Sequence, residues 1–193
     1  MDYPVYQISI SDDPNDESGM GYMSIVDKPA IEMDFLVFSK DLKYEIDDEK
    51  RVITGAAIIA DKPIYRELDG EKCYTVFSAQ VIDKIVKKWG VKQNYSLVNT
   101  HHSAPVEGMH LFESYLINKE RGMNPPNEFK GVADGSWFVS YYITSDDLWK
   151  KIKAGEFMGF SIEINAKVEK EEQLQELDEM LKEFIATCTN SIY

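Results

Sequence analysis

The chain has 193 residues, of which 44% are hydrophobic, and it carries a formal net charge of −13 with a pI near 4.7. This length and composition allow a buried core, which argues against disorder throughout and predicts one domain with appendages. The acidic balance, without a basic stripe, disfavours nucleic-acid binding, which depends on clustered Lys and Arg.

Membrane insertion and export are also disfavoured by the sequence. The longest apolar stretches, residues 52–60 and 135–145, have the length of strands, whereas a membrane helix needs roughly 20 residues. The first residues lack the basic, apolar and small-residue order of a signal peptide. Cys73 and Cys188 have no CxxC neighbour, which predicts two unpaired thiols. We therefore expect a soluble chain that is not exported and makes no membrane contact.

The first 43 residues are predicted to form an N-terminal arm. Residues 5–10 favour a short strand, and residues 11–21 combine Asp, Asn, Pro, Ser and Gly, which is typical of a loop. Residues 23–40 complete the arm.

Residues 44–166 are predicted to form the main domain. Its first strand, residues 52–60, contains the small-residue patch Gly55-Ala56-Ala57, where a strand can curve. A strand at 73–77 follows. Ser78 is then a good N-cap for a helix with Val81, Ile82, Ile85, Val86 and Trp89 on one face, and Gly90 is its expected end.

The second half of this domain is predicted to be rich in strands. Residues 94–99 and 106–118 favour strands, and residues 119–135 are rich in Pro, Gly, Asn and charge, which is typical of an exposed excursion. An apolar strand then leads to Ser145, which opens a helix that Gly155 closes.

The end of the chain changes character. Residues 159–165 favour a strand, and residues 167–193 carry apolar residues at helical spacing among many Glu residues, which predicts an acidic amphipathic helix. Short strands with two intervening helices predict an α+β domain built on an antiparallel sheet or barrel.

Ser161 is the candidate nucleophile. In an extended GFSIEIN segment, Phe160, Ile162 and Ile164 share one face, whereas Ser161 and Glu163 share the other. A serine on the polar face of a strand is usually only solvated. It becomes a nucleophile when an imidazole takes its proton, so the histidines are decisive.

The three histidines are His101, His102 and His110. The adjacent pair would point to opposite sides if extended, so one of them at most would face a given cleft. A zinc site from these residues and Glu113 lacks HExxH spacing. We expect no metal and no cofactor.

Familiar hydrolase and nucleotide motifs are missing. The segment around Ser161 lacks the second glycine of a nucleophile elbow and continues as a strand, which disfavours an α/β-hydrolase. Gly19 and Gly21 are not followed by the Lys and helix of a phosphate-binding loop.

Four segments in succession resemble the XkdF-type phage serine proteases, relatives of tailed-phage prohead maturation proteases. They are MSIVDKPAIEMDFLVFSK, RVITGAAIIADKPIYR, NTHHSAPVEGMHLFESYLI and DGSWFVSYYITSDDLWKKIKAGEFMGFSIEI, within residues 22–165. The resemblance implies the fold of herpesvirus assemblin, a mostly antiparallel β-barrel with flanking helices. Here an N-terminal arm and a C-terminal amphipathic helix would be added to it.

The resemblance also implies site residues. The family's histidine falls at His102, and its nucleophile, in a GFSI or GLSI motif, falls at Ser161. Another His or a carboxylate orients the histidine in this fold, and the candidates are Glu163 and Glu113. Many relatives carry a glycine shortly after the serine, where this chain reads Ile162-Glu163-Ile164.

The implied function is a prohead maturation serine endopeptidase in the host cytoplasm, inside the assembling phage head. Its partners would be scaffold and major capsid protein, and it would cleave scaffold, extensions of the capsid protein and its own chain. A second copy of the chain could join it in a homodimer. The alternative is a catalytically inactive protein that keeps the protease fold and serves as a structural or assembly component of the head. Neither nucleic acid nor a membrane is expected as a partner.

Overall fold

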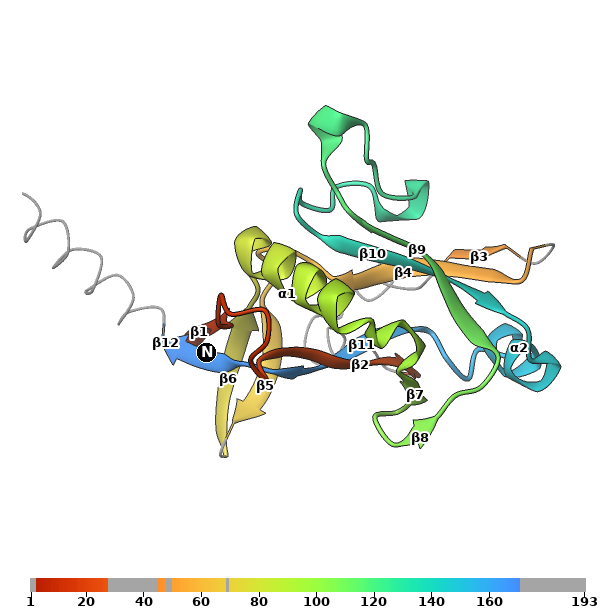
Figure 1. Ribbon diagram of the computed structural model, residues 1–193, viewed down its shortest axis with the longest axis horizontal. Coiled ribbons are helices and arrows are strands. Elements are labelled where there is room, and N and C mark those ends of the chain that lie inside the picture. Colours follow the sequence, from red (N-terminus) through yellow and green to blue (C-terminus); the bar gives the residue numbers. More distant parts are fainter. Residues whose placement is uncertain (1–2, 28–44, 48–49, 69, 171–193) are drawn as a thin grey trace, which may run out of the picture.

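The computed structural model describes residues 3–27, 45–47, 50–68 and 70–170. Within these ranges the chain forms twelve strands, two α-helices and three short 3-10 helices. The strands are arranged in three four-stranded sheets (Figure 1). No helix in the described part of the chain has the length and apolarity needed to cross a membrane.

The first sheet joins the two ends of the described chain. Its strand order is β12 (Lys167–Lys170), β1 (Val5–Ser9), β6 (Glu71–Val76) and β5 (Ile64–Leu68). Strand β1 runs antiparallel to β12 and parallel to β6, and β5 and β6 form an antiparallel pair. Strands β12 and β1 lie side by side at the left of Figure 1.

The second sheet is antiparallel throughout. Its order is β3 (Glu45–Asp47), β4 (Val52–Ile58), β10 (Trp137–Ile143) and β9 (Met109–Leu116). Strand β10 is central and almost entirely buried, which explains why its sequence is apolar rather than alternating.

The third sheet carries the candidate site. Its order is β11 (Gly159–Asn165), β2 (Gly19–Val26), β7 (Val98–Thr100) and β8 (Ala104–Pro105). Strand β2 is antiparallel to β11 and parallel to β7. The strand furthest toward the N-terminus in this sheet therefore lies between two strands from the second half of the chain.

The predicted barrel with flanking helices is wrong. Closure of a barrel requires the first and last strands of a sheet to pair, whereas each of the three described sheets is open and ends in two edge strands. The described residues also contain only two α-helices. The described part of the chain is therefore mostly β-sheet.

Helix α1 (Ala79–Lys92) confirms the predicted N-cap and corrects the predicted end. The Ser78 side chain accepts a hydrogen bond from the Val81 N–H, but the helix continues past Gly90. It ends where Gln93 adopts a left-handed conformation (φ 54°) and its N–H bonds to the Gly90 carbonyl. Gln93 thus adopts the left-handed conformation for which helix ends usually use glycine.

Helix α2 (Asp146–Lys153) begins as the sequence predicts. The Ser145 side chain accepts a hydrogen bond from the Leu148 N–H, and Asp146 and Asp147 occupy the first turn, where negative charge is favourable.

The core lies between the sheets and α1. Its largest side chains include Trp89 of α1 and Trp137 of β10, whose ring centroids are 5.0 Å apart, and it includes Met23 and Ile25 of β2. Burial of this face fixes the register of β2, because a shift by one residue would turn the apolar set outward.

Several local predictions also differ from the structure. Residues 94–96 form a 3-10 helix, and the strand starts at Val98. The excursion 119–135 is anchored by the buried Phe129, whose ring lies 5.2 Å from that of Phe138.

The predictions for the two ends of the chain compare differently with the structure. Residues 5–26, assigned to an arm, supply β1 and β2 of two sheets. Residues 167–170, assigned to the acidic helix, form β12 because they pair with β1, and residues 171–193 lie outside the described ranges. The division at residues 43 and 166 stays a prediction.

Candidate active site

A row of polar side chains crosses the third sheet at one register position. Ser161 on β11 pairs with Ser24 on β2, and Ser24 pairs in turn with Asn99 on β7. Side chains directly opposite each other on neighbouring strands are adjacent on one face. Glu163 shares that face with Ser161, two residues away, and a β-bulge follows it between Glu163 and Ile164.

A tight turn carries His102 over this row. Residues 101–103 connect β7 to β8, and the Ser103 N–H bonds to the Thr100 carbonyl at 2.9 Å. His101 and His102 both have positive φ, 48° and 56°. Type I′ turns require this at both central positions and normally take Gly or Asn. Each non-glycine residue costs on the order of 1 kcal/mol there, and the cost is offset by the contacts that follow.

The His102 imidazole lies between a hydroxyl and a carboxylate. Its Nε2 is 3.1 Å from Ser161 Oγ, and its Nδ1 is 3.1 Å from Glu163 Oε1. These distances lie in the range expected for a nucleophile, its base and the group that orients the base.

Two further side chains determine the tautomer of His102. An ionised carboxylate only accepts hydrogen bonds, so Asn99 presents its Nδ2 amide group to Glu163 Oε1, at 2.7 Å. The Asn99 carbonyl oxygen therefore faces Ser24, whose hydroxyl donates to it at 2.5 Å. Ser24 Oγ lies 2.9 Å from His102 Nδ1 and, having given its one proton to Asn99, can only accept there.

This network places the ring proton on Nδ1 and the lone pair on Nε2. The Nε2 lone pair then faces the Ser161 hydroxyl, which can donate to it. A neutral histidine in this tautomer is able to act as a general base toward Ser161.

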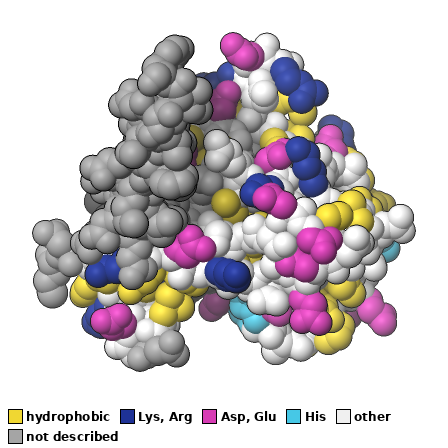
Figure 2. Space-filling view, turned by 60° about the vertical axis from the view of Figure 1, so that its left-hand side comes forward, with side chains coloured by type: hydrophobic (Ala, Val, Ile, Leu, Met, Phe, Trp, Pro, Cys, Tyr) yellow, Lys and Arg dark blue, Asp and Glu magenta, His cyan; other side chains and the backbone are white. Residues whose placement is uncertain are grey.

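The side chains of Ser24, Asn99 and Ser161 are buried, whereas those of His102 and Glu163 are partly exposed to solvent. Ser24 and Asn99 are 0% and 6% exposed, and Ser161 is 9% exposed. The side chains of His102 and Glu163 are 39% and 37% exposed. Figure 2 shows histidine side chains at the surface, on a face where Lys and Arg are interspersed with Asp and Glu. The polar row is therefore largely shielded from water, while the imidazole remains accessible to a substrate.

The second carboxylate candidate, Glu113, lies in a different sheet. It is on β9, where its Oε2 accepts a hydrogen bond from Ser140 Oγ at 2.6 Å, and Ser140 Oγ lies 2.9 Å from Thr54 Oγ1. The structure therefore brings Ser161, His102 and Glu163 together and leaves Glu113 apart.

The other histidines have separate environments. His101 Nδ1 lies 3.5 Å from Asp27 Oδ1, and its ring contacts Phe157 at 5.4 Å between centroids. His110 Nε2 lies 3.0 Å from Thr144 Oγ1 on the second sheet. Within the described ranges, no three His, Cys, Asp or Glu side chains lie close enough together to hold a metal ion.

Sequence reasoning missed Ser24 and Asn99. Both lie inside segments that carry the family resemblance, but nothing in the local pattern says that residue 24 pairs in parallel with a strand 75 residues later. The available signal was alternation, because a serine stands between the apolar Met23 and Ile25 in a strand-like run.

Comparison with protein families gave a match that covers most of the chain. The family described as "Putative phage serine protease XkdF" matches residues 41–170. This range contains His102, Ser161, Glu163 and Asn99, whereas Ser24 lies before it. Comparison with curated proteins and with solved structures found no match.

Proposed function

Because the chain belongs to the family of phage serine proteases described as XkdF, we propose that it is a serine endopeptidase whose nucleophile is Ser161. The observation that carries the proposal is the pair of 3.1 Å contacts of His102, one to the Ser161 hydroxyl and one to Glu163.

The proposed reaction is acyl transfer in two halves. Ser161 Oγ attacks a peptide carbonyl while its proton passes to His102 Nε2. The imidazolium is stabilised by Glu163 at Nδ1, and it then gives the proton to the leaving amine as the C–N bond breaks. A water molecule attacks the acyl-enzyme through the same base, which releases the acid and returns Ser161 to its hydroxyl form.

We further propose that the substrates are proteins of the assembling phage head. The resemblance to prohead maturation proteases names scaffold, extensions of the major capsid protein and the chain itself. Cleavage would then take place in the host cytoplasm, inside the prohead.

The experiment is co-expression of the chain with scaffold and major capsid protein of the same phage. Ser161→Ala is expected to abolish processing, and Ser96→Ala, at an exposed serine outside the network, is the matched control. Labelling of the purified chain by a fluorophosphonate is expected at Ser161 and is expected to be lost in His102→Ala. Normal processing by Ser161→Ala would refute the proposal.

A second candidate function rests on the low exposure of Ser161, 9%, and on the Ile162-Glu163-Ile164 sequence, since the resemblance implies a glycine shortly after the serine in many relatives. It is a catalytically inactive head component with this fold. Absence of labelling in free and assembled protein, with the chain present at fixed stoichiometry in mature particles, would support it.

A further inference from the structure

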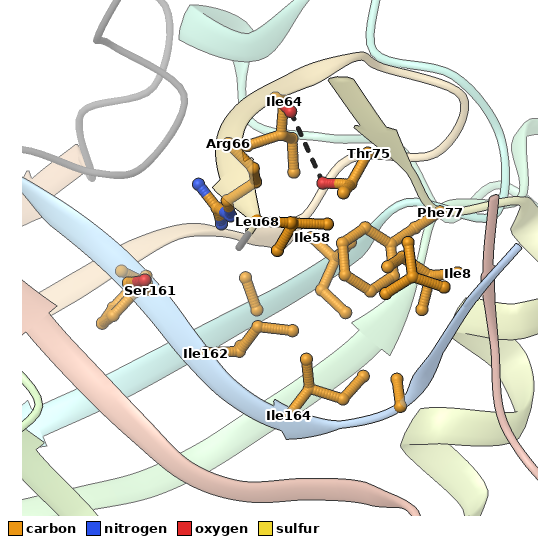
Figure 3. A pocket seen from close by; sticks show the side chains of 14 residues that line it. Ile8, Ile58, Ile64, Arg66, Leu68, Thr75, Phe77, Ser161, Ile162 and Ile164 are labelled. Atoms are coloured by element: carbon orange, nitrogen blue, oxygen red, sulfur yellow. Dashed lines mark hydrogen bonds between the residues drawn. The ribbon is translucent and has the colours of Figure 1, made fainter. Parts of the chain in front are cut away.

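An apolar cavity of about 200 Å³ lies beside the candidate nucleophile. Ser161 stands at one end of it, and residues of the first sheet and of β4 form the opposite wall (Figure 3). All but three of the fourteen side chains that line it are apolar, the exceptions being Arg66, Thr75 and Ser161. The apolar side chains that β11 contributes lie on the strand face opposite to the Ser161 hydroxyl. Because β11 is an edge strand, the partly open cavity meets Ser161 at this edge.

The position of His102 decides which part of a substrate can reach this cavity. In the proposed reaction the leaving amine must lie near His102 Nε2 to receive its proton. None of the side chains that hold Nδ1, namely those of Glu163, Asn99 and Ser24, lines the cavity. The cavity therefore lies away from the side chains that hold Nδ1, and it is available to the acyl part of the substrate, which extends away from the leaving amine.

The size of the cavity fits one large side chain. An apolar cavity of roughly 150 Å³ in another protein holds a benzene molecule, and the present cavity is larger. It can therefore take a side chain of the size of Leu, Met or Phe. An aliphatic or aromatic group placed there gains from leaving water.

A charged side chain is less suited to these walls. Burial of a carboxylate among Ile58, Ile162 and Phe77 carries a desolvation cost unless a partner offsets it. Arg66 is the one cation on the wall, and its Nη1 donates to the Tyr65 carbonyl at 3.2 Å. Burial lowers the pKa of this guanidinium, so its surroundings are poorly hydrated. The Arg66 side chain makes a preference for an acidic residue the main competing outcome.

We propose that this cavity binds the side chain on the acyl side of the scissile bond and that this side chain is large and apolar. The inference rests on the proposed function. It names a substrate class for the site: peptides with Leu, Met or Phe immediately before the cleaved bond.

The test uses four peptidyl diphenyl phosphonates that differ only in the residue at phosphorus: Leu, Phe, Gly or Asp. The rate of adduct formation at Ser161 is measured by mass spectrometry on the full chain. The Leu and Phe probes are expected to react at least about tenfold faster than the Gly probe, and the Asp probe no faster than Gly. Leu68→Trp, which fills the cavity from a half-exposed wall position, is expected to lower the Leu-to-Gly rate ratio at least fivefold.

A small alkyl fluorophosphonate distinguishes failure of the cavity inference from failure of the protease proposal. If it labels Ser161 but the four phosphonates react equally, or the Asp probe reacts fastest, the cavity inference is overturned and the protease proposal stands. If neither reagent class labels Ser161, both are overturned. Labelling of Leu68→Trp by the small reagent also shows that the variant is folded, so a loss of preference is then a result about the cavity.

Discussion

Replacement of Glu163 by Gln tests whether its carboxylate stabilises the imidazolium of His102. The Gln side chain keeps an oxygen that can accept hydrogen bonds from His102 Nδ1 and Asn99 Nδ2, the contacts of 3.1 and 2.7 Å. It removes the negative charge and places an NH2 group where the second carboxylate oxygen stood. Any loss of rate therefore reports the charge on Glu163 rather than the geometry of the ring.

The size of the effect follows from distance and exposure. At 3.1 Å, the attraction between unit charges is about 1.3 kcal/mol at the dielectric constant of water and about 5 kcal/mol at an effective value of 20. Both side chains are more than one third exposed, which favours the lower part of this interval. We take about 2 kcal/mol, which corresponds to a roughly 30-fold slower reaction.

The assay is the second-order rate constant for labelling of Ser161 by a fluorophosphonate at neutral pH. Glu163→Gln is expected to reduce it roughly 30-fold, and Glu163→Ala further, because Nδ1 then also loses an acceptor. Glu113→Gln is the matched control and is expected to stay within about twofold of the wild type, since Glu113 bonds to Ser140 in another sheet. The reasoning is refuted if Glu163→Gln labels within threefold of wild type, or if Glu113→Gln loses as much.

Three other outcomes are expected. Asn99→Ala removes the amide that donates to Glu163 and should slow the same labelling about tenfold; an unchanged rate would show that Glu163 needs no support. Tyr141→Phe should leave the melting temperature unchanged or raise it by a few degrees. The buried Tyr141 hydroxyl has no hydrogen-bond partner among the described residues, and such an unpaired group costs about 1–3 kcal/mol of stability. A clear fall in melting temperature would contradict this. Burial raises the pKa of the Cys73 thiol, so peptide mass spectrometry should find Cys73 alkylated far more slowly in native than in unfolded protein at pH 8; equal rates would contradict this.

Some residues of the site can be predicted from the sequence, and others cannot. The resemblance named His102 and Ser161 as a pair, and alternation along one strand placed Glu163 beside Ser161, which is a local property. Ser24 and Asn99 could not be found in this way. Their contribution depends on parallel pairing of β2 with β7, and strand pairing over such a separation leaves no trace in local periodicity.

The fold shows the same limit. The caps at Ser78 and Ser145 were predictable because a cap depends on three or four neighbouring residues. The barrel prediction failed because closure depends on which distant edges meet. The pattern of the residues that follow predicts a helix for residues 167–170, whereas pairing with β1 holds them in a strand.

The central place of β2 in the third sheet has a consequence for when the site can assemble. Ser24 is 78 residues from His102, and His102 is 59 residues from Ser161. Contacts over such separations form late, because the entropy of closing the intervening loops is lost before the contacts compensate for it. A chain still growing on the ribosome holds no complete Ser161–His102–Glu163 arrangement until β11 has emerged and docked on β2. The order of synthesis itself therefore keeps Ser161 and His102 apart until β11 has joined the third sheet.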